Sequence, residues 1–417
     1  MPDRSSALRE ILIPAASLLS AARGSEGACG DDIAATLARL ASSEPYGEVP
    51  AGAMPDECLK RALALAEKYD IAPIERTREL LAGLLMVAPL VAAARAAGIP
   101  PEEIGLVFGS TTSGTPEIVT TLRSLKAFET KNAAAAPWKL VDIGRTATVI
   151  ARALKICGPV FTVSTACTAS AKAILDGARL LSIGRVRAVV AGGVDILSPL
   201  TEGGFSALGA RSEHRARPFS SDRAGLHLGE GGGFLLLSTD TKAFPSAPVR
   251  LAGGGETSDA HHICAPEPAG IGASRAVKDA LKATFSGHPV SSDTIGFALL
   301  HGTATAQNDA MEAKVIATAL PGVPCASLKR AVGHQLAGAG GFNAAVAWGL
   351  LANPKSTVPL NFQTDTAGTM DSALGEALGS TLTRPEENTQ SLAHRRILVT
   401  AYAFGGSNAA LLFEARA

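Results

Sequence analysis

Short apolar runs alternate along this chain with longer stretches in which apolar residues recur at helical spacing. In the clearest pair, Val160–Val163 predicts a strand and residues 169–183 predict an amphipathic helix. Such alternation is typical of layered α/β proteins, so we expect an α/β fold. Further strands are predicted at 104–108, 188–194, 233–237, 249–253, 294–300 and within 397–413.

The segment 238–248 interrupts this alternation near the middle of the chain. It carries an aspartate and two prolines, which favour a connection over a regular element. We therefore predict two halves, 1–245 and 246–417, each with its own strand–helix–strand core. The polar run 386–394 predicts a surface loop before the last strand pair.

Composition narrows the class of protein. The chain has 417 residues, of which 47% are hydrophobic, so a compact globular protein is expected. The chain has 38 basic residues (Lys and Arg) and 38 acidic residues (Asp and Glu), so its formal net charge is zero. No overall positive charge is therefore present to attract nucleic acid. The apolar stretch 11–22 is flanked by acidic residues and an arginine, which favours a first strand and turn over a signal peptide. The sequence has no run of about 18 uninterrupted apolar residues, the pattern that would predict a membrane span.

The six cysteines are widely scattered and include no Cys-x-x-Cys pair. This distribution predicts free thiols in a reducing compartment, hence a cytoplasmic protein, and no metal site.

The most informative stretch is 163–170, Val-Ser-Thr-Ala-Cys-Thr-Ala-Ser, which places Cys167 where a predicted strand becomes a predicted helix. A helix N-terminus favours thiolate by about 0.3 to 1 kcal/mol, and by up to about 2 when partly buried. We therefore expect the pKa of Cys167 to move from its ordinary value towards neutrality, as in a nucleophile. The alternative is a small buried cysteine that packs the strand against the helix.

Three other segments carry candidate chemistry. His301 follows an apolar run in the loop His-Gly-Thr-Ala-Thr, and His334 opens a stretch rich in Gly and Ala. A Gly-rich turn, Phe404-Gly405-Gly406, joins the last two predicted strands. Taken singly, these segments also suit a structural histidine, tight helix packing and an ordinary hairpin.

In chain order, these motifs and three more closely resemble the elongating β-ketoacyl-acyl carrier protein synthases of the thiolase fold. The three are Arg217-Pro218-Phe219, Gly229-Glu230-Gly231 and Asp259-Ala260-His261-His262. The resemblance runs from about Arg76 to the C-terminus, and the first 75 residues match poorly. It implies a five-layered α-β-α-β-α sandwich of two similar halves, with the nucleophilic Cys in the first half and two catalytic His in the second.

The resemblance also implies a reaction, a decarboxylative Claisen condensation of an acyl chain on Cys167 with malonyl-acyl carrier protein. The reaction needs a nucleophile, an oxyanion hole and donors to an enolate. By resemblance, the N–H groups of Cys167 and Phe404 form the oxyanion hole, and Phe404 gates the acyl pocket. Neutral His301 and His334 donate to the malonyl thioester carbonyl. No cofactor is implied, because the substrates are carried on the phosphopantetheine of acyl carrier protein.

Further roles follow from the resemblance alone. Lys329 would orient His301, with Glu312 as its acidic partner. Thr303 and Thr305 would hydrogen-bond the pantetheine arm.

The chain also departs from the family pattern. Asn343 stands where a glutamate is usual, so Lys329 loses one expected counter-charge, and Cys264 replaces a common pantetheine-contacting threonine. Ala403 replaces a glycine of the gating loop, which would stiffen it. Thr112 stands where a bulky aliphatic residue often closes the acyl pocket, which predicts a deeper or more polar pocket.

Four other classes of protein share part of this pattern. A biosynthetic thiolase would carry a second cysteine where this chain has Phe404-Gly405-Gly406, and an initiating synthase would have Asn in place of His334. A hydrolase would need a G-x-S-x-G or G-x-C-x-G elbow. A non-catalytic chain-length-factor-like subunit normally lacks the active cysteine, although this chain would also suit the catalytic half of such a heterodimer.

The implied partners are acyl carrier protein and a second subunit, in a homodimer or a heterodimer. Acidic carrier protein would dock on basic residues, for which Arg76, Arg78, Lys126 and Arg211 are the candidates. The acyl chain, and the choice between fatty acid and polyketide or aryl polyene synthesis, stay open at this level.

Overall fold

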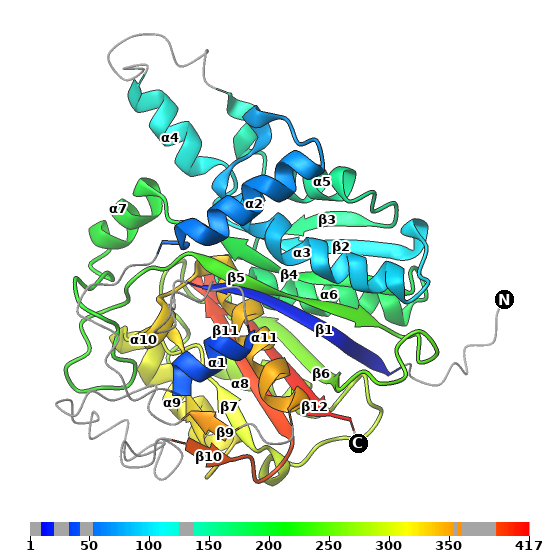
Figure 1. The fold of residues 1–417 in the computed structure, drawn as a ribbon. Coiled ribbons are helices and arrows are strands. Elements are labelled where there is room, and N and C mark those ends of the chain that lie inside the picture. The colour runs from blue at the N-terminus through cyan, green and yellow to red at the C-terminus, as the bar shows by residue number, and fades with distance from the viewer. Residues whose placement is uncertain are drawn as a thin grey trace.

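The structure, a computed structural model, describes residues 10–20, 33–41, 53–124, 137–353, 357–359 and 389–416. Ten of the described strands form one mixed sheet (Figure 1). Its order is β3-β2-β4-β5-β1-β6-β12-β11-β7-β8, and the N- and C-terminal halves of the chain meet at the antiparallel pair β1–β6. The first five strands along the chain are β1 (Ile11–Ser20), β2 (Ile104–Gly109), β3 (Val160–Val163), β4 (Ala188–Asp195) and β5 (Gly231–Ser238). The other five are β6 (Val249–Ser258), β7 (Phe297–Leu299), β8 (Cys325–Ala326), β11 (Arg396–Ala403) and β12 (Ser407–Ala415).

The two halves of the sheet repeat one topology. When the strands of each half are numbered along the chain, both halves have the order 3-2-4-5-1. In both, the second strand is parallel to the third and fourth, while the fifth is antiparallel to the fourth and first. The prediction of two similar α/β halves is therefore confirmed, whereas the exact boundary at residue 245 stays a prediction.

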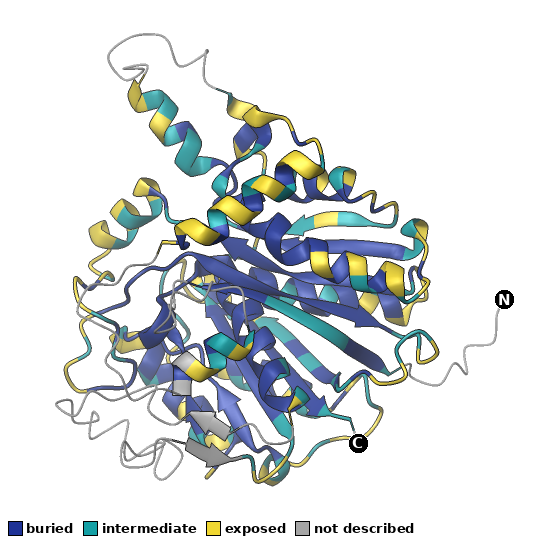
Figure 2. Cartoon of the chain, viewed as in Figure 1, coloured by how far each residue is buried: buried dark blue, intermediate teal, exposed yellow. Residues whose placement is uncertain are grey.

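Helices form three layers around the two half-sheets, so the five-layered arrangement is also as predicted. One outer layer contains α2 (Asp56–Lys68), α3 (Arg78–Ala96) and α5 (Arg145–Ala153). The central layer contains α6 (Ala169–Ser182) and α11 (Ala339–Ala352), and the other outer layer contains α8 (Ile271–Leu281) and α9 (Ala306–Ala319). The remaining helices are α1 (Ile33–Ala41), α4 (Thr115–Ser124), α7 (Pro199–Ala207) and α10 (Lys329–Val332). Exposed residues gather on the outer helices, while most of the sheet is buried (Figure 2).

Alternation along the strands divides the interior into separate cores. Leu106 and Phe108 of β2 face the outer core under α3, whereas Val107 between them faces the central core. In β12, Leu411 faces the central core and Leu412 faces the core under α8 and α9. Both faces of each half-sheet are covered, which explains why the strands appear in the sequence as continuous apolar runs.

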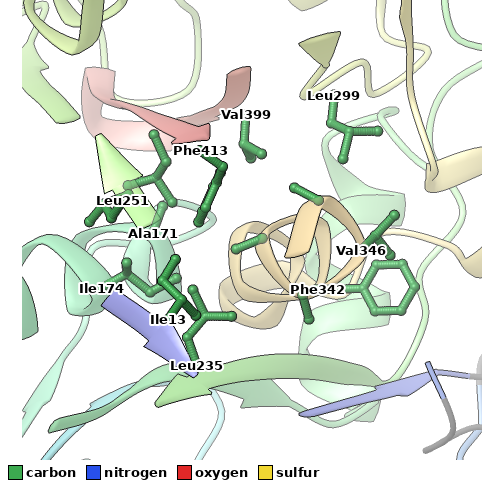
Figure 3. Close-up of a cluster of buried hydrophobic side chains, with 14 of the residues drawn as sticks. Ile13, Ala171, Ile174, Leu235, Leu251, Leu299, Phe342, Val346, Val399 and Phe413 are labelled. Atoms are coloured by element: carbon green, nitrogen blue, oxygen red, sulfur yellow. The ribbon is translucent and has the colours of Figure 1, made fainter. Parts of the chain in front are cut away.

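The central core depends on small residues that let helix and sheet approach closely. A Cβ atom added to Gly341 of α11 would lie 2.3 Å from the carbonyl oxygen of Gly233 in β5. Leu235 of β5 and Val399 of β11 belong to different half-sheets, yet they pack in the same cluster around α11 (Figure 3). The helix is therefore buried on almost every side.

Two sequence predictions differ from the structure in detail. The strand expected at 294–300 is limited to β7, because residues 292–294 form a short 3₁₀ helix. Within the predicted surface loop 386–394, Thr389–Ser391 forms strand β10, which pairs with β9 (Thr357–Pro359). Residues 386–388 lie outside the described residues.

The cysteines also need a correction. Cys58 of α2 is disulfide-bonded, and Cys29 lies outside the described residues. The expectation that all six cysteines are free thiols is therefore wrong for Cys58. The four others that are described, Cys157, Cys167, Cys264 and Cys325, are free.

One helix of the described chain, α3, is long and apolar enough to cross a membrane. However, 72% of its most apolar window is buried inside the protein, between α2, α5 and the sheet. We therefore assign α3 to the core.

Two isoleucines that differ in burial should contribute very differently to the free energy of unfolding. Ile174 of α6 is fully buried, while Ile183 at the end of the same helix is 76% exposed. Ile174→Ala should lower the free energy of unfolding by about 2–5 kcal/mol, because it leaves a cavity in a packed core. Ile183→Ala should change it by less than about 0.5 kcal/mol. Denaturant titration of both variants measures the difference, and equal losses would contradict it.

Candidate active site

Cys167 lies in the tight turn between β3 and α6. The helix begins at Ala169 with Thr168 as its N-cap, so the thiol stands two residues before the first helical position. Ala166 takes a left-handed conformation with φ of 50°, an uncommon one for a residue with a side chain. The turn holds Cys167 in a buried position, with 9% of its surface exposed.

A hydroxyl pair ties this turn to the Gly-rich turn before β12. The Thr168 hydroxyl donates to the carbonyl oxygen of Thr165 at 2.7 Å, and its oxygen lies 2.8 Å from the Ser407 hydroxyl. Ser407 follows Phe404-Gly405-Gly406 directly. The nucleophile turn and the predicted gate are therefore linked across 239 residues of sequence.

A cavity of about 280 Å³ opens beside Cys167. Its lining comes from both halves of the chain and combines most residues predicted from the separate motifs. The predicted site residues on its wall are Cys167, Cys264, His301, Thr303, Thr305, His334 and Phe404. The hydroxyl oxygens of Thr303 and Thr305 lie 2.8 Å apart on that wall.

Backbone hydrogen bonds fix the ring of His334. Its Nδ1 accepts the N–H of Leu336 at 3.1 Å, so the proton of the neutral ring lies on Nε2. Its own backbone N–H donates to the carbonyl oxygen of His227 at 2.8 Å. Because His334 lines the cavity, it offers a neutral N–H donor there.

Lys329 fixes the ring of His301 in the same way. Its Nζ lies 3.2 Å from His301 Nδ1 and also donates to the His301 carbonyl oxygen. An ammonium group only donates, so Nδ1 accepts and the ring proton lies on Nε2. The His301 and His334 rings meet edge to face, with centroids 5.4 Å apart and planes 83° apart.

Burial keeps both rings neutral. It lowers the pKa of each histidine well below the ordinary range, and the nearby Lys329 cation lowers both further. Burial also lowers the pKa of Lys329 to about 8, despite the attraction of Glu312. Near neutral pH, the site therefore contains two neutral donors and one lysine that remains mostly charged.

Glu312 of α9 has a different main contact from the one the family resemblance implies. Its carboxylate accepts the backbone N–H groups of His301 at 2.8 Å and Gly302 at 2.7 Å. The Thr400 hydroxyl donates to it at 2.8 Å. Glu312 thus fixes the turn that carries His301, and it acts on Lys329 through its charge.

Asp309 is a supporting residue that sequence reasoning missed. It accepts the N–H groups of Phe219 at 2.7 Å and Thr303 at 3.1 Å, which joins the Arg-Pro-Phe motif to the His301 loop. Burial raises its pKa to about 7. A signal was present, because Asp309 precedes Glu312 by three residues and so shares its helical face.

The expected shift of the Cys167 thiol towards neutrality is wrong. Burial raises its pKa to about 12, Lys329 lowers it in part and Asp195 raises it again. A helix N-terminus contributes at most about 2 kcal/mol, or about 1.5 pKa units, which is less than this rise. The resting nucleophile is therefore a thiol.

Aromatic side chains form the mouth of the cavity. Phe404 is 40% exposed and packs on Phe205 of α7, with ring centroids 5.8 Å apart. Gly405 of this turn has φ of 81°, a conformation that glycine adopts easily. The Asp259 N–H donates to the Gly406 carbonyl oxygen at 2.8 Å, so the Asp-Ala-His-His motif supports the turn.

Thr112, predicted to shape the acyl pocket, and Asn343, at the position of a usual counter-charge of Lys329, lie away from this cavity. Thr112 is buried, but its hydroxyl hydrogen-bonds Glu79 at 3.1 Å and Asp195 at 2.9 Å instead of lining the cavity. Asn343 is buried in α11 and does not line the cavity either.

The predicted carrier-binding arginines are engaged by carboxylates. Arg78 pairs with Glu230 at 2.6 Å, and Arg211 lies 3.5 Å from Glu202. Arg76 likewise lies 3.7 Å from Glu67, and Lys126 is outside the described residues. The three described arginines therefore form a weaker basic patch than the sequence suggests.

Two family models match the chain. The β-ketoacyl synthase N-terminal domain matches residues 82–243, and the β-ketoacyl synthase C-terminal domain matches residues 249–362. Together they cover well over half of the sequence. The protein therefore belongs to the β-ketoacyl synthase family.

Individual relatives agree with this assignment. The 3-oxoacyl-[acyl-carrier-protein] synthase 2 of Synechocystis sp. is 32% identical over 272 residues, and the match spans 62% of each protein. The structure of the ketosynthase ApeO in complex with its chain length factor ApeC from Xenorhabdus doucetiae matches with a TM-score of 0.79 at 30% identity, over 100% of both chains. The ishigamide ketosynthase/chain length factor shares the fold, with a TM-score of 0.80, 22% identity and coverage of 99% of this chain and 100% of that one.

The protonated state of Cys167 can be tested by alkylation with iodoacetamide, which requires the thiolate. With a pKa of about 12, the rate at Cys167 should rise about tenfold per pH unit from about pH 7 to about pH 10. Peptide mass spectrometry measures the rate, with the exposed Cys157 as the accessible control. A rate that levels off near neutral pH would instead support the thiolate expected from the sequence.

Proposed function

We propose that the protein is an elongating β-ketoacyl-acyl carrier protein synthase. The observation that carries the proposal is the cavity itself, whose wall combines Cys167 with His301 and His334, two neutral histidines that each carry the ring proton on Nε2. A nucleophile and two fixed N–H donors are the groups that a decarboxylative Claisen condensation needs.

In the first half-reaction, the Cys167 sulfur would attack the acyl thioester on acyl carrier protein. A carbon–sulfur bond forms to Cys167, the bond to the pantetheine sulfur breaks, and the thiol proton ends on the released pantetheine. The N–H groups of Cys167 and Phe404 are proposed as donors to the tetrahedral oxyanion. The buried thiol suits this exchange, because one neutral thiol replaces another.

In the second half-reaction, malonyl-acyl carrier protein would lose CO₂ and leave an enolate. His301 and His334 would donate from Nε2 to the enolate oxygen, and the Lys329 cation would add a favourable field. The enolate carbon then attacks the acyl-Cys167 carbonyl, and the thiolate that leaves takes up one proton. The products are 3-ketoacyl-acyl carrier protein, CO₂ and free Cys167.

The site supports an active enzyme over a non-catalytic subunit of the same fold. A subunit that only shapes its partner's pocket needs neither a nucleophile nor fixed histidine tautomers. Here Lys329, Glu312 and Asp309 all support the loop that carries His301. Removal of one N–H donor to a developing oxyanion typically lowers turnover about 10²- to 10³-fold.

The partner is proposed to be a second chain of ketosynthase fold. Strand β3 lies at one end of the sheet and pairs with β2 alone among the described strands, and Phe161 on it is 39% exposed. An apolar edge strand of this kind favours pairing with another strand. The solved ketosynthase with its chain length factor supports a heterodimer, and the residues after β3 lead directly to Cys167.

Intact-mass analysis of the protein with acyl- and malonyl-acyl carrier proteins tests the reaction. The wild type should form an acyl adduct and a 3-ketoacyl product two carbons longer, and Cys167→Ala should form neither. His334→Ala should still be acylated but should condense about 10²- to 10³-fold more slowly, because one enolate donor is lost.

The exposed His288 provides the matched control, and His288→Ala should behave as the wild type. A product from Cys167→Ala would contradict the proposed nucleophile. A wild type with neither adduct nor product, even with its partner subunit, would favour the non-catalytic alternative.

Association through β3 predicts that Phe161→Asp disrupts the dimer, because a charge would be buried between the paired strands. Native mass spectrometry of the chain, alone and with a co-expressed partner, should show a dimer for the wild type and a monomer for the variant. Ile271→Asp, at a residue 61% exposed on the other half, is the control and should leave the dimer intact. A Phe161→Asp dimer as stable as the wild type would place the interface elsewhere.

A further inference from the structure

The backbone takes an unfavourable turn directly after His334. Leu336 has φ of 47°, in the left-handed region that few residues with side chains adopt. This conformation aims the Leu336 N–H at His334 Nδ1, 3.1 Å away. The hydrogen bond decides which ring nitrogen carries the proton. The turn must therefore be held by other contacts if His334 is to keep its Nε2–H donor.

Asp195, the last residue of β4, supplies such a contact. It is fully buried, and its Oδ2 accepts the N–H of Ala337, the residue after Leu336, at 2.8 Å. Its Oδ1 accepts the N–H groups of Thr111 and Thr112 at 2.8 and 3.0 Å. One carboxylate thus joins the turn after β2 to the turn after His334.

A second buried carboxyl group, Glu79 of α3, lies in the same cluster. The Ser110 hydroxyl is 2.9 Å from Glu79 Oε2 and 3.4 Å from Asp195 Oδ1, and the Thr112 hydroxyl is 3.1 and 2.9 Å from the same two oxygens. A hydroxyl has a single proton to donate. It can therefore hydrogen-bond both carboxyl groups at once only if one carboxyl group is protonated and donates to the hydroxyl oxygen.

The proton belongs on Glu79. Asp195 accepts three backbone N–H groups, which favour its ionised form, whereas Glu79 Oε1 is buried and has no partner among the described residues. Burial raises the pKa of both carboxyl groups, and the charge of Asp195 raises that of Glu79 further, to about 8, in agreement with this assignment.

We propose that Asp195 is a positioning residue for His334, and that Glu79 remains a neutral acid so that Asp195 can hold the single negative charge. Asp195 fixes Ala337, which keeps Leu336 in its left-handed conformation and so keeps the Nε2–H of His334 directed to the substrate. The proposal rests on the proposed function, in which His334 donates to the enolate and takes no part in loading Cys167.

The test compares Asp195→Asn with the wild type in the two half-reactions. An amide keeps the size of the side chain but cannot accept the same set of N–H groups. Because the charge of Asp195 raises the pKa of the Cys167 thiol, its loss should not slow acylation. Condensation should fall at least tenfold, which corresponds to about 1.4 kcal/mol. Thr111→Val removes one hydroxyl donor to Asp195 at a less buried position. It should also slow condensation without slowing acylation, but by a smaller factor than Asp195→Asn.

Matched variants complete the design. Glu79→Gln imitates the protonated acid and should leave both half-reactions near the wild type. Asp293→Asn makes the same chemical change at an exposed aspartate and is the control. Wild-type condensation in Asp195→Asn, or equal loss of both half-reactions, would overturn the positioning role. A loss in Glu79→Gln like that in Asp195→Asn would overturn the assignment of the proton.

A second readout does not depend on turnover. Nuclear magnetic resonance of isotope-labelled histidine reports which ring nitrogen is protonated. The wild type should show His334 protonated at Nε2, and Asp195→Asn should show a mixture of tautomers with His301 unchanged. A wild type that forms no product refutes the proposed function, whereas an unchanged His334 tautomer in Asp195→Asn refutes the inference.

Discussion

One hydrogen bond between the two central helices holds the site together. The Ser170 hydroxyl, in the first turn of α6, accepts the N–H of Gly341, in the first turn of α11, at 2.8 Å. A Cβ atom on Gly340 would lie 3.0 Å from the Cβ of Ala171, so the two helix starts are in close contact. Cys167 and His334 each precede one of these starts by a few residues. Because the helices are buried between two half-sheets, the nucleophile and the donor have little freedom to separate.

The same burial determines the electrostatics. It keeps a cysteine as thiol and two histidines as neutral rings, and it brings the pKa of Lys329 down to about 8. In the proposed reaction, negative charge that develops on a thioester oxygen would therefore meet fixed N–H donors and one nearby cation in a buried site. Such preorganised donors act more strongly in a low dielectric than in solution. Burial thus disfavours a resting Cys167 thiolate, but it strengthens the interaction of the N–H donors with negative charge on the reacting oxygen.

The sequence was sufficient to predict a site residue wherever the pattern that indicates it lies within a few neighbouring residues. The strand–turn–helix around Cys167 and the loops of His301 and His334 follow from short-range patterns, and the structure places all three residues on one cavity. Signals that depend on distant partners were not visible. Thr112 looked like a pocket residue because its hydroxyl partners, Glu79 and Asp195, are 33 and 83 residues away.

The same limit applies to Arg78 and to the pKa of Cys167. Arg78 looked available for a carrier protein because Glu230, its partner, lies 152 residues further along the chain. The pKa of Cys167 was misjudged for a similar reason. The sequence shows the helix start, but the burial that outweighs it comes from both halves of the fold.

The repeat explains how two similar halves divide the chemistry. In each half, three parallel strands end at the same edge, the usual place for a site in such sheets. In the C-terminal half, β7 leads to His301, β8 leads to Lys329 and His334, and β11 leads to Phe404.

Among the described strands of the N-terminal half, β3 leads to the proposed reacting group, Cys167. The ends of β2 and β4 provide Thr112 and Asp195, which are buried as polar support. Equivalent positions thus differ between the halves: one half carries the proposed donors, and the other carries the proposed nucleophile and Asp195, which accepts the N–H of Ala337 after His334. A single half would lack either the proposed nucleophile or the proposed enolate donors, so the proposed reaction requires both.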